Sequence, residues 1–344
     1  MTLELTLEKQ LAGFPLELSL SSDSRRIGIL GPSGCGKSMT LKMLAGVVSP
    51  DRGRIRVDGR VLYDSEKRIC LPPRERQVGY LFQNYALFPA MTVAQNIAAG
   101  LHCPKGERQA RVGELIRRFR LEGLENRRPG QISGGQQQRT ALARMMAAQP
   151  RTILLDEPFS ALDLALREAV QTELLEFLSD YPGQVIMVSH SLEELYRFCD
   201  FLAVMERGRL LTAGNRDQVF RNPGSVPVAR LVGCENILPA RRVDGHRLYL
   251  TDWGVTLTTA WPVPENAAAL GIRAQALTPA PEPGENRIPV LLRSRTETPF
   301  RCRSQAVPPQ KPEAPPIWWE QGKGTADCPG WLAVPPEEVL PLTL

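Results

Sequence analysis

The glycine-rich segment Gly31–Ser38 carries the residue types that phosphate chemistry needs. An apolar run over residues 27–30 precedes it and a helix-like stretch beginning with Met39 follows, which is the strand–turn–helix context of a phosphate-binding loop. Glycines let backbone amides approach an anion closely, and the helix N-terminus adds its dipole. The expected nucleotide-binding residues are therefore Gly31, Pro32, Ser33, Gly34, Cys35, Gly36, Lys37, Ser38 and Met39. Among them, Lys37 is expected to reach the β- and γ-phosphates, and the Ser38 hydroxyl to bind Mg²⁺.

Two carboxylates, Asp156 and Glu157, end a second apolar run over residues 152–155. Ligands of parallel α/β sheets bind where strands end. We therefore predict that Asp156 holds Mg²⁺ through water and that Glu157 polarises an attacking water as general base. Paired acids could instead cap a helix or bind an arginine. Gln83 and His190 also follow predicted strands, and each taken alone could be an ordinary polar residue.

A second anion-binding segment precedes the helix predicted over residues 137–148. It consists of Ser133, Gly134, Gly135 and Gln136. A hydroxyl and unpaired amides at a helix start can bind an anion. One nucleotide cannot easily occupy two loops so far apart in the same domain. We therefore expect two chains to pair head to tail, each placing this segment over the γ-phosphate held by the other.

Composition limits the protein class. With 344 residues, 42% hydrophobic and 23% charged, the chain has room for two globular domains. No apolar run approaches the ~20 residues that span a bilayer, and residues 1–5 do not resemble a secretory signal. Seven scattered cysteines without a Cys-x-x-Cys pair argue against zinc or disulfides and for a reducing cytosol. The net charge of +5 does not favour a nucleic-acid partner.

Periodicity predicts an α/β fold around these residues. Alternation over residues 3–7, 16–20 and 27–29 indicates half-buried strands, and residues 54–57 and 61–63 flank a turn at Asp58–Arg60. Buried runs at 152–156 and 184–189 alternate with helices, as in parallel sheets. Residues 84–135 form a predicted helical insertion, and two strands at 201–206 and 209–212 close the first domain.

The second domain is predicted from composition, because 19 of the 30 prolines follow residue 220. We place the first domain at residues 1–233 and a small, β-rich, proline-rich domain at 234–344. Alternating residues at 248–250, 255–257, 288–292 and 331–334 indicate its strands. Residues 308–316 are predicted to be an extended break.

Residues 1–220 resemble the ATP-binding subunit of an ABC transporter. The resemblance rests on motifs in the family's order: Walker A at Gly31–Ser38, the Q-loop at Gln83, the LSGGQ signature at Ile132–Gln136 with isoleucine for the usual leucine, Walker B at Asp156, the catalytic glutamate at Glu157, the D-loop at Ser160–Asp163 and the switch histidine at His190. The only aromatic residue upstream of Walker A, Phe14, is nearer to it than the family's adenine-stacking residue.

The resemblance implies a P-loop NTPase sheet with an antiparallel β subdomain and a helical insertion, binding ATP and Mg²⁺. It implies catalytic roles for Lys37, Gln83, Glu157 and His190, and metal contacts from Ser38, Gln83 and Asp156. It also implies a homodimer or paired ATPase subunits at the cytoplasmic face of the inner membrane. The partners would be transmembrane permease subunits and, through them, a substrate-binding protein. The residues after Gln83, namely Tyr85, Leu87, Phe88 and Pro89, resemble the surface that receives a permease coupling helix.

The cargo is predicted from Asp58–Phe88, which resembles molybdate-importer ATPases. Its portion Ser-Glu-Lys-Arg-Ile-Cys-Leu-Pro-Pro, residues 65–73, separates it from sugar and sulfate relatives. Those ATPases carry a small regulatory β-barrel, so residues 234–344 are expected to be OB/TOBE-like. Sulfate, iron and polyamine importers remain alternatives. A soluble ABC ATPase of DNA repair or translation is disfavoured by the single Walker A motif, and a P-loop kinase or GTPase by Ser133–Gln136 and His190.

Overall fold

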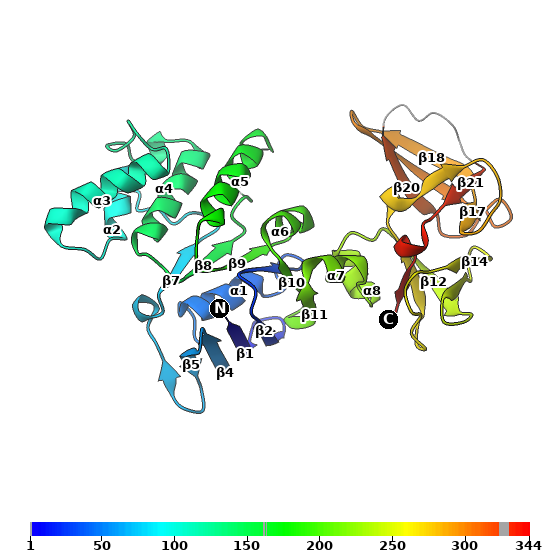
Figure 1. Cartoon of the computed structure of the whole chain (residues 1–344), viewed down its shortest axis with the longest axis horizontal. Coiled ribbons are helices and arrows are strands. Elements are labelled where there is room, and N and C mark those ends of the chain that lie inside the picture. Colours follow the sequence, from blue (N-terminus) through cyan, green and yellow to red (C-terminus); the bar gives the residue numbers. More distant parts are fainter. Residues whose placement is uncertain (1, 161, 163, 323–329) are drawn as a thin grey trace. The chain divides into compact units, whose positions relative to one another are not determined.

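The computed structural model describes residues 2–160, 162, 164–322 and 330–344, and residues 164–166 by their backbone only. The chain forms two compact units, Met1–Gly214 and Asn215–Leu344 (Figure 1). The division falls earlier than the predicted boundary after residue 233. Two short helices, α7 (Arg216–Arg221) and α8 (Val226–Leu231), therefore belong to the second unit.

An 11-stranded mixed sheet organises the first unit, in the order β6-β5-β4-β1-β2-β11-β10-β3-β9-β8-β7. Strands β10, β3, β9, β8 and β7 are parallel, whereas β2, β1, β4, β5 and β6 pair antiparallel. The prediction of an α/β sheet with an antiparallel part is confirmed. The strands are β1 (Leu3–Gln10), β2 (Pro15–Ser22), β3 (Arg26–Leu30), β4 (Arg52–Val57), β5 (Arg60–Asp64), β6 (Ile69–Cys70), β7 (Val78–Leu81), β8 (Thr152–Asp156), β9 (Gln184–Ser189), β10 (Phe201–Glu206) and β11 (Arg209–Asn215).

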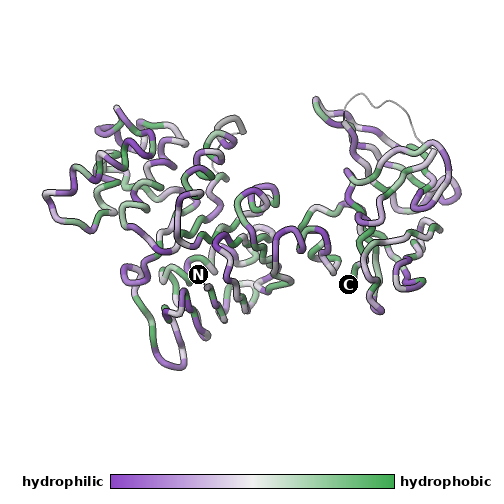
Figure 2. The backbone as a smooth tube through the Cα atoms, in the orientation of Figure 1, coloured by the Kyte–Doolittle hydropathy of each residue, from purple (hydrophilic) through white to green (hydrophobic). Residues whose placement is uncertain are grey.

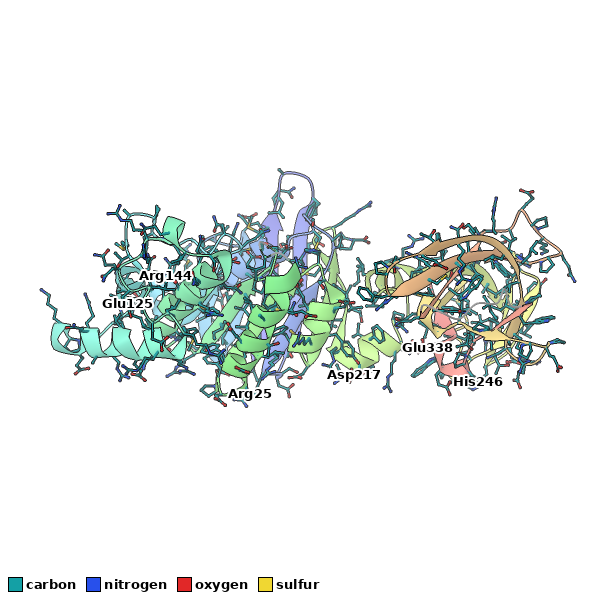
Figure 3. All side chains as sticks on the ribbon, turned by 90° about the horizontal axis from the view of Figure 1, so that it is seen from above. Arg25, Glu125, Arg144, Asp217, His246 and Glu338 are labelled. Carbon is teal, nitrogen blue, oxygen red and sulfur yellow. The ribbon has the colours of Figure 1, made fainter. Side chains whose placement is uncertain are left out.

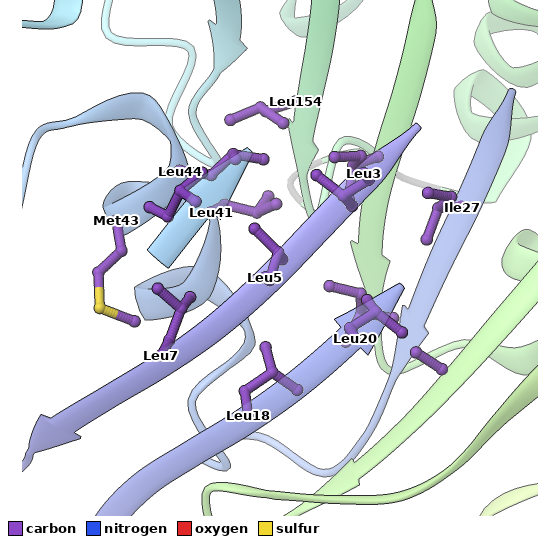
Figure 4. Packing of buried hydrophobic residues seen from close by; sticks show 14 of the residues in the cluster. Leu3, Leu5, Leu7, Leu18, Leu20, Ile27, Leu41, Met43, Leu44 and Leu154 are labelled. Atoms are coloured by element: carbon purple, nitrogen blue, oxygen red, sulfur yellow. The ribbon is translucent and has the colours of Figure 1, made fainter. Parts of the chain in front are cut away.

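Burial explains the two strand patterns. Every residue of β8 and β9 is buried, since these central parallel strands are covered on both faces. Strand β2 alternates exposed and buried residues, as a strand with one covered face does. Leucines of β1 and β2 pack against α1 (Lys37–Ala45), so the helix that begins in the glycine-rich loop lies on the main core (Figure 4). Hydrophobic residues follow these central strands in Figure 2.

The remaining helices of this unit are α2 (Val93–Ala99), α3 (Lys105–Arg118), α4 (Gly134–Ala147), α5 (Leu164–Ser179) and α6 (Leu192–Phe198). Helices α2, α3 and α4 pack together near the β7 side of the sheet (Figure 1). Single 3₁₀ turns occur at Pro73–Glu75 and Pro129–Gln131. None of the helices in the described ranges has both the length and the hydrophobicity that a membrane span requires.

The second unit is β-rich, as predicted. It contains a sheet in the order β14-β13-β12-β15-β22 and two three-stranded sheets, β16-β21-β17 and β18-β19-β20. Its buried residues form a large apolar cluster among the sheets and a smaller one among α8, β15 and β22. The strands are β12 (Asn236–Arg242), β13 (Arg247–Leu250), β14 (Val255–Thr258), β15 (Ala269–Ile272), β16 (Thr278–Ala280), β17 (Arg287–Pro289), β18 (Leu291–Glu297), β19 (Arg301–Val307), β20 (Ile317–Gly322), β21 (Trp331–Ala333) and β22 (Leu340–Leu342), with 3₁₀ turns at Ala274–Ala276 and Pro336–Glu338.

Residues 308–316 do not form the extended break that we predicted. Two consecutive turns shape the segment, because Lys311 N donates to Pro308 O and Ala314 N donates to Lys311 O. Trp253 Nε1 also donates to Pro315 O at 3.1 Å. Proline content alone predicted extension, but the backbone hydrogen bonds within the segment form turns, and the Trp253 side chain binds the end of the second turn.

Candidate nucleotide site

The predicted site residues follow four neighbouring strands of the sheet. The glycine-rich loop follows β3, His190 follows β9, Asp156 ends β8, and Gln83 lies two residues after β7. These strands are adjacent in the order β3-β9-β8-β7 and parallel. Their carboxyl ends therefore meet at one edge of the sheet, where ligands of such folds bind.

The backbone of the loop Gly31–Ser38 adopts a conformation and a close approach to a neighbouring strand that need glycine at two positions. Gly36 is the N-cap of α1 and has φ 110°, a left-handed conformation that favours glycine. A Cβ atom on Gly31 would lie 2.3 Å from Met205 O, so the loop closely approaches β10. The first turn of α1 contains no acidic residue. Its free amides and helix dipole thus suit a phosphate group.

Lys37 is held at the centre of this loop. Its side chain is 4% exposed, and Nζ donates to Gly31 O at 2.8 Å and Pro32 O at 3.0 Å. The ammonium also lies 3.8 Å from Glu157 Oε1. The loop carbonyls therefore fix a positive charge beside the N-terminus of α1, which is the position a triphosphate requires.

Asp156 connects the loop to strand β8 and is 4% exposed. Ser38 Oγ donates to Asp156 Oδ1 at 2.7 Å, as expected if both contact one metal ion. The Tyr80 hydroxyl donates to Asp156 Oδ2, also at 2.7 Å. Burial, and the bond to Asp156, raise the pKa of Tyr80, so its hydroxyl stays protonated. The hydroxyl and carboxylate oxygens are hard ligands, and this donor set fits Mg²⁺.

Glu157 and His190 lie together beside this cluster. His190 Nδ1 is 3.3 Å from Glu157 Oε2, and their side chains are 55% and 15% exposed. Glu157 has φ 44°, which is unusual for a residue with a side chain. The bonds from Glu157 N to Val188 O at 3.1 Å and from Ser160 Oγ to Glu157 O at 2.9 Å hold this backbone. Such imposed strain is typical of functional positions.

Gln83 and Ser133–Gln136 are not joined to this cluster. Gln83 is exposed. Ser133 is the N-cap of α4, where Ser133 Oγ accepts from Gln136 N and Gln136 Oε1 accepts from Ser133 N. Within the described residues, no hydrogen bond or ion pair connects this segment to Gly31–Ser38. Of the predicted D-loop, Ala161 and Asp163 lie outside the described residues.

Arg144 organises the surface that follows Gln83. Its guanidinium donates to Tyr85 O at 3.0 Å and Ala86 O at 2.8 Å, and lies 5.0 Å from the centre of the Phe88 ring. Asn96 of α2 accepts from Phe88 N and donates to Phe88 O. These contacts present Phe88 with 46% of its surface exposed. Arg144 lies in the helical part of the unit (Figure 3); no local sequence signal identified it.

Arg76 supports the glycine-rich loop from the far end of α1. It is 3% exposed, and its Nη1 donates to Met43 O at 2.7 Å and Leu44 O at 2.9 Å, near the helix C-terminus. Burial lowers the pKa of Arg76. A cation stabilises a helix C-terminus through the dipole. Arg76 belongs to Asp58–Phe88, the segment that carries the cargo prediction, and it joins this segment to the helix of the candidate nucleotide site. Phe14, the aromatic residue upstream of the glycine-rich loop, packs against Gly208: a Cβ atom on Gly208 would lie 2.7 Å from Phe14 Cδ2.

Comparison with known proteins agrees with this geometry. A family model described as ABC transporter matches residues 15–160. Spermidine/putrescine import ATP-binding protein PotA of Acidothermus cellulolyticus is 41% identical over 70% of this chain and 63% of its own length. Fe(3+) ions import ATP-binding protein FbpC of Pseudomonas fluorescens is 42% identical over 69% of this chain and 68% of its own length. Sulfate/thiosulfate import ATP-binding protein CysA 1 of Agrobacterium fabrum is 40% identical over 70% of this chain and 71% of its own length.

A solved structure shows the same fold. A dimeric ATP-binding cassette bound to ADP and Pi in a post-hydrolysis state is 26% identical, with a TM-score of 0.53. The alignment covers 62% of this chain and 98% of that one. The motifs, their convergence at one sheet edge and these similarities agree. The chain therefore belongs to the family of ABC transporter ATP-binding proteins.

Proposed function

We propose that this chain hydrolyses ATP to energise an ABC importer whose cargo is molybdate or a related oxyanion. The observation that supports the ATPase activity best is the convergence of Lys37, Asp156, Glu157 and His190 at adjacent strand ends. A phosphate cradle, a metal-binding pair and a base next to a histidine are the parts that phosphoryl transfer to water needs.

Each side chain has a role in this proposal. The amides of the loop and Lys37 would hold the β- and γ-phosphates, and Ser38, with Asp156 through water, would hold Mg²⁺. The metal ion neutralises charge on the phosphates when it is bound. Glu157 accepts a proton from the attacking water. His190, whose Nδ1 lies 3.3 Å from Glu157 Oε2, orients the Glu157 carboxylate. Gln83, which is exposed and outside this cluster, would be a further metal ligand from the loop after β7.

A second copy of the chain completes the site. In the described part of one chain, no hydrogen bond or ion pair joins Ser133, Gly134, Gly135 and Gln136 to Gly31–Ser38, and their helix N-terminus suits an anion. In a head-to-tail dimer, each copy would place these residues over the γ-phosphate of the other. The related cassette structure is dimeric. Transmembrane permease subunits would dock on the exposed Phe88 and Pro89 of the predicted surface, at the cytoplasmic face of the inner membrane, and a substrate-binding protein would act through them. Tyr85, also predicted for this surface, is only 5% exposed and would support it from below.

The cargo assignment is supported by the resemblance of Asp58–Phe88 to molybdate-importer ATPases. The three relatives described above are named for import of spermidine/putrescine, ferric ions and sulfate/thiosulfate. Polyamine, iron and sulfate are therefore the competing cargoes. The second unit is proposed as a regulatory domain of the OB/TOBE type.

Uptake assays separate these cargoes. Cells carrying Glu157→Gln at the native locus are compared with wild-type cells for uptake of molybdate, sulfate, ferric iron and spermidine. Loss of molybdate uptake alone is the expected result. If uptake of only one of the other three cargoes were lost, the importer would be reassigned to that cargo. Unchanged uptake rates for all four cargoes would refute the import function. Glu193→Gln, the same chemical change at an exposed position of α6, is the matched control.

A further inference from the structure

Tyr80 contacts the candidate metal site although it belongs to none of the motifs. It lies on β7, and its backbone pairs with Leu154 of β8. Its ring packs against Phe82, with 4.2 Å between the ring centres. Its hydroxyl donates to Asp156 Oδ2 at 2.7 Å. The hydroxyl therefore reaches the carboxylate directly, from the strand on the side away from the glycine-rich loop.

Both oxygens of Asp156 are thus occupied by hydroxyl donors. Oδ2 accepts from Tyr80, and Oδ1 accepts from Ser38 Oγ at 2.7 Å. These two bonds fix the plane of the carboxylate, since each oxygen has its own donor. A serine hydroxyl has one hydrogen and two lone pairs. Because Ser38 gives its hydrogen to Asp156, its lone pairs remain available to a cation.

We propose that Tyr80 is a positioning residue for Mg²⁺. Tyr80 holds the Asp156 carboxylate, the carboxylate orients the Ser38 hydroxyl, and the hydroxyl presents its lone pairs to the metal. This inference rests on the proposed ATPase function, because it requires that Ser38 and Asp156 bind the metal. Residues that hold metal ligands in place commonly change metal affinity by about 10- to 100-fold when they are removed.

A purely structural role predicts a different result. If the Tyr80 hydroxyl only joined β7 to β8, its loss would weaken the fold and lower nucleotide affinity with or without metal. Tyr63 provides the comparison, because its hydroxyl likewise donates a hydrogen bond away from solvent, to the backbone carbonyl Pro50 O at 2.9 Å. No described hydrogen bond of Tyr63 reaches the nucleotide site.

The test compares Tyr80→Phe with Tyr63→Phe in the full chain. Binding of a non-hydrolysable ATP analogue is measured by calorimetry, first in EDTA and then across a Mg²⁺ titration. For Tyr80→Phe, we expect the half-saturating Mg²⁺ concentration to rise about tenfold, with unchanged affinity in EDTA. Tyr63→Phe should match the wild type in both measurements.

Two results would overturn the positioning role: an unchanged Mg²⁺ half-saturation, or an equal loss of affinity in EDTA and in Mg²⁺. Failure of the proposed function is distinguishable, because the wild type itself would then show no Mg²⁺-dependent binding. The titration is repeated in a Ser38→Ala background. If Tyr80 acts through Asp156 on Ser38, its substitution there has a smaller effect, whereas a full tenfold effect in that background would refute the relay.

Discussion

Replacing Glu157 by glutamine tests the general base with little change in shape. Glutamine has the same length and branching, so the strain of φ 44° and the bond from the residue 157 amide to Val188 O persist. The change removes one negative charge that lies 3.8 Å from Lys37 Nζ, which leaves that ammonium more available to phosphate. We therefore expect ATP binding to be retained and proton acceptance from water to be lost.

General-base catalysis contributes about 10²- to 10⁴-fold to a rate. This corresponds to roughly 3–5 kcal/mol of the activation barrier. The expected result for Glu157→Gln is therefore single-turnover hydrolysis slower than wild type by about that factor. Since binding continues without hydrolysis, the ATP-bound dimer should accumulate.

The assay uses excess protein over radiolabelled ATP, and size-exclusion chromatography with ATP measures the dimer. Glu193→Gln should hydrolyse ATP at the wild-type rate. Hydrolysis by Glu157→Gln within a factor of about two of the wild type would refute the assignment of Glu157 as general base, because removal of the base must cost far more. A slow variant that remains monomeric with ATP would refute the head-to-tail dimer while leaving the base in place.

Two further substitutions test the packing and electrostatics around the site. Gly31→Ala should destabilise the chain by about 1–3 kcal/mol in thermal unfolding, because its Cβ would lie 2.3 Å from Met205 O. Gly113→Ala on α3, where the atom nearest to the new Cβ is 4.0 Å away, should instead stabilise the chain by about 0.5–1 kcal/mol. Equal melting temperatures for the two variants would contradict this reasoning. The Glu194 carboxylate accepts from Ser189 Oγ, and burial raises the pKa of Glu194 above its unfolded value of 4.5. The free energy of unfolding therefore falls as the pH rises from the unfolded-state pKa through the folded-state pKa. Glu194→Gln should therefore raise the melting temperature at pH 7 but not at pH values below the unfolded pKa, and an equal shift at both would exclude the charge as its cause.

The residues of the candidate nucleotide site could be named from the sequence wherever the sequence signal is local. Gly31–Ser38 is one continuous segment between a strand and a helix, and fully buried strands such as β8 read as apolar runs. Asp156 and Glu157 follow such a run directly. Their chemistry could therefore be inferred before any contact was known.

Long-range contacts were not predictable in the same way. Tyr80 meets Asp156 across 76 residues, Arg144 meets Ala86 across 58, and Arg76 meets Met43 across 33. A single tyrosine or arginine has no periodicity that names its partner. Residues 308–316 show the converse error, since a local proline signal predicted extension where contacts impose turns.

The sequence by itself determined the chemical groups of this protein: a glycine-rich loop expected to hold phosphate, two carboxylates, a histidine and a second segment expected to bind an anion. These follow from residue types at short spacing, which fix backbone freedom and donor chemistry. Only the tertiary structure decided which groups meet. Parallel pairing of β3, β9, β8 and β7 brings His190 to Glu157 and Ser38 to Asp156, and leaves Ser133 outside the cluster within one chain. The physical reason is that the order of the strands in the sheet determines which strand ends are neighbours, and spacing along the chain does not contain this order.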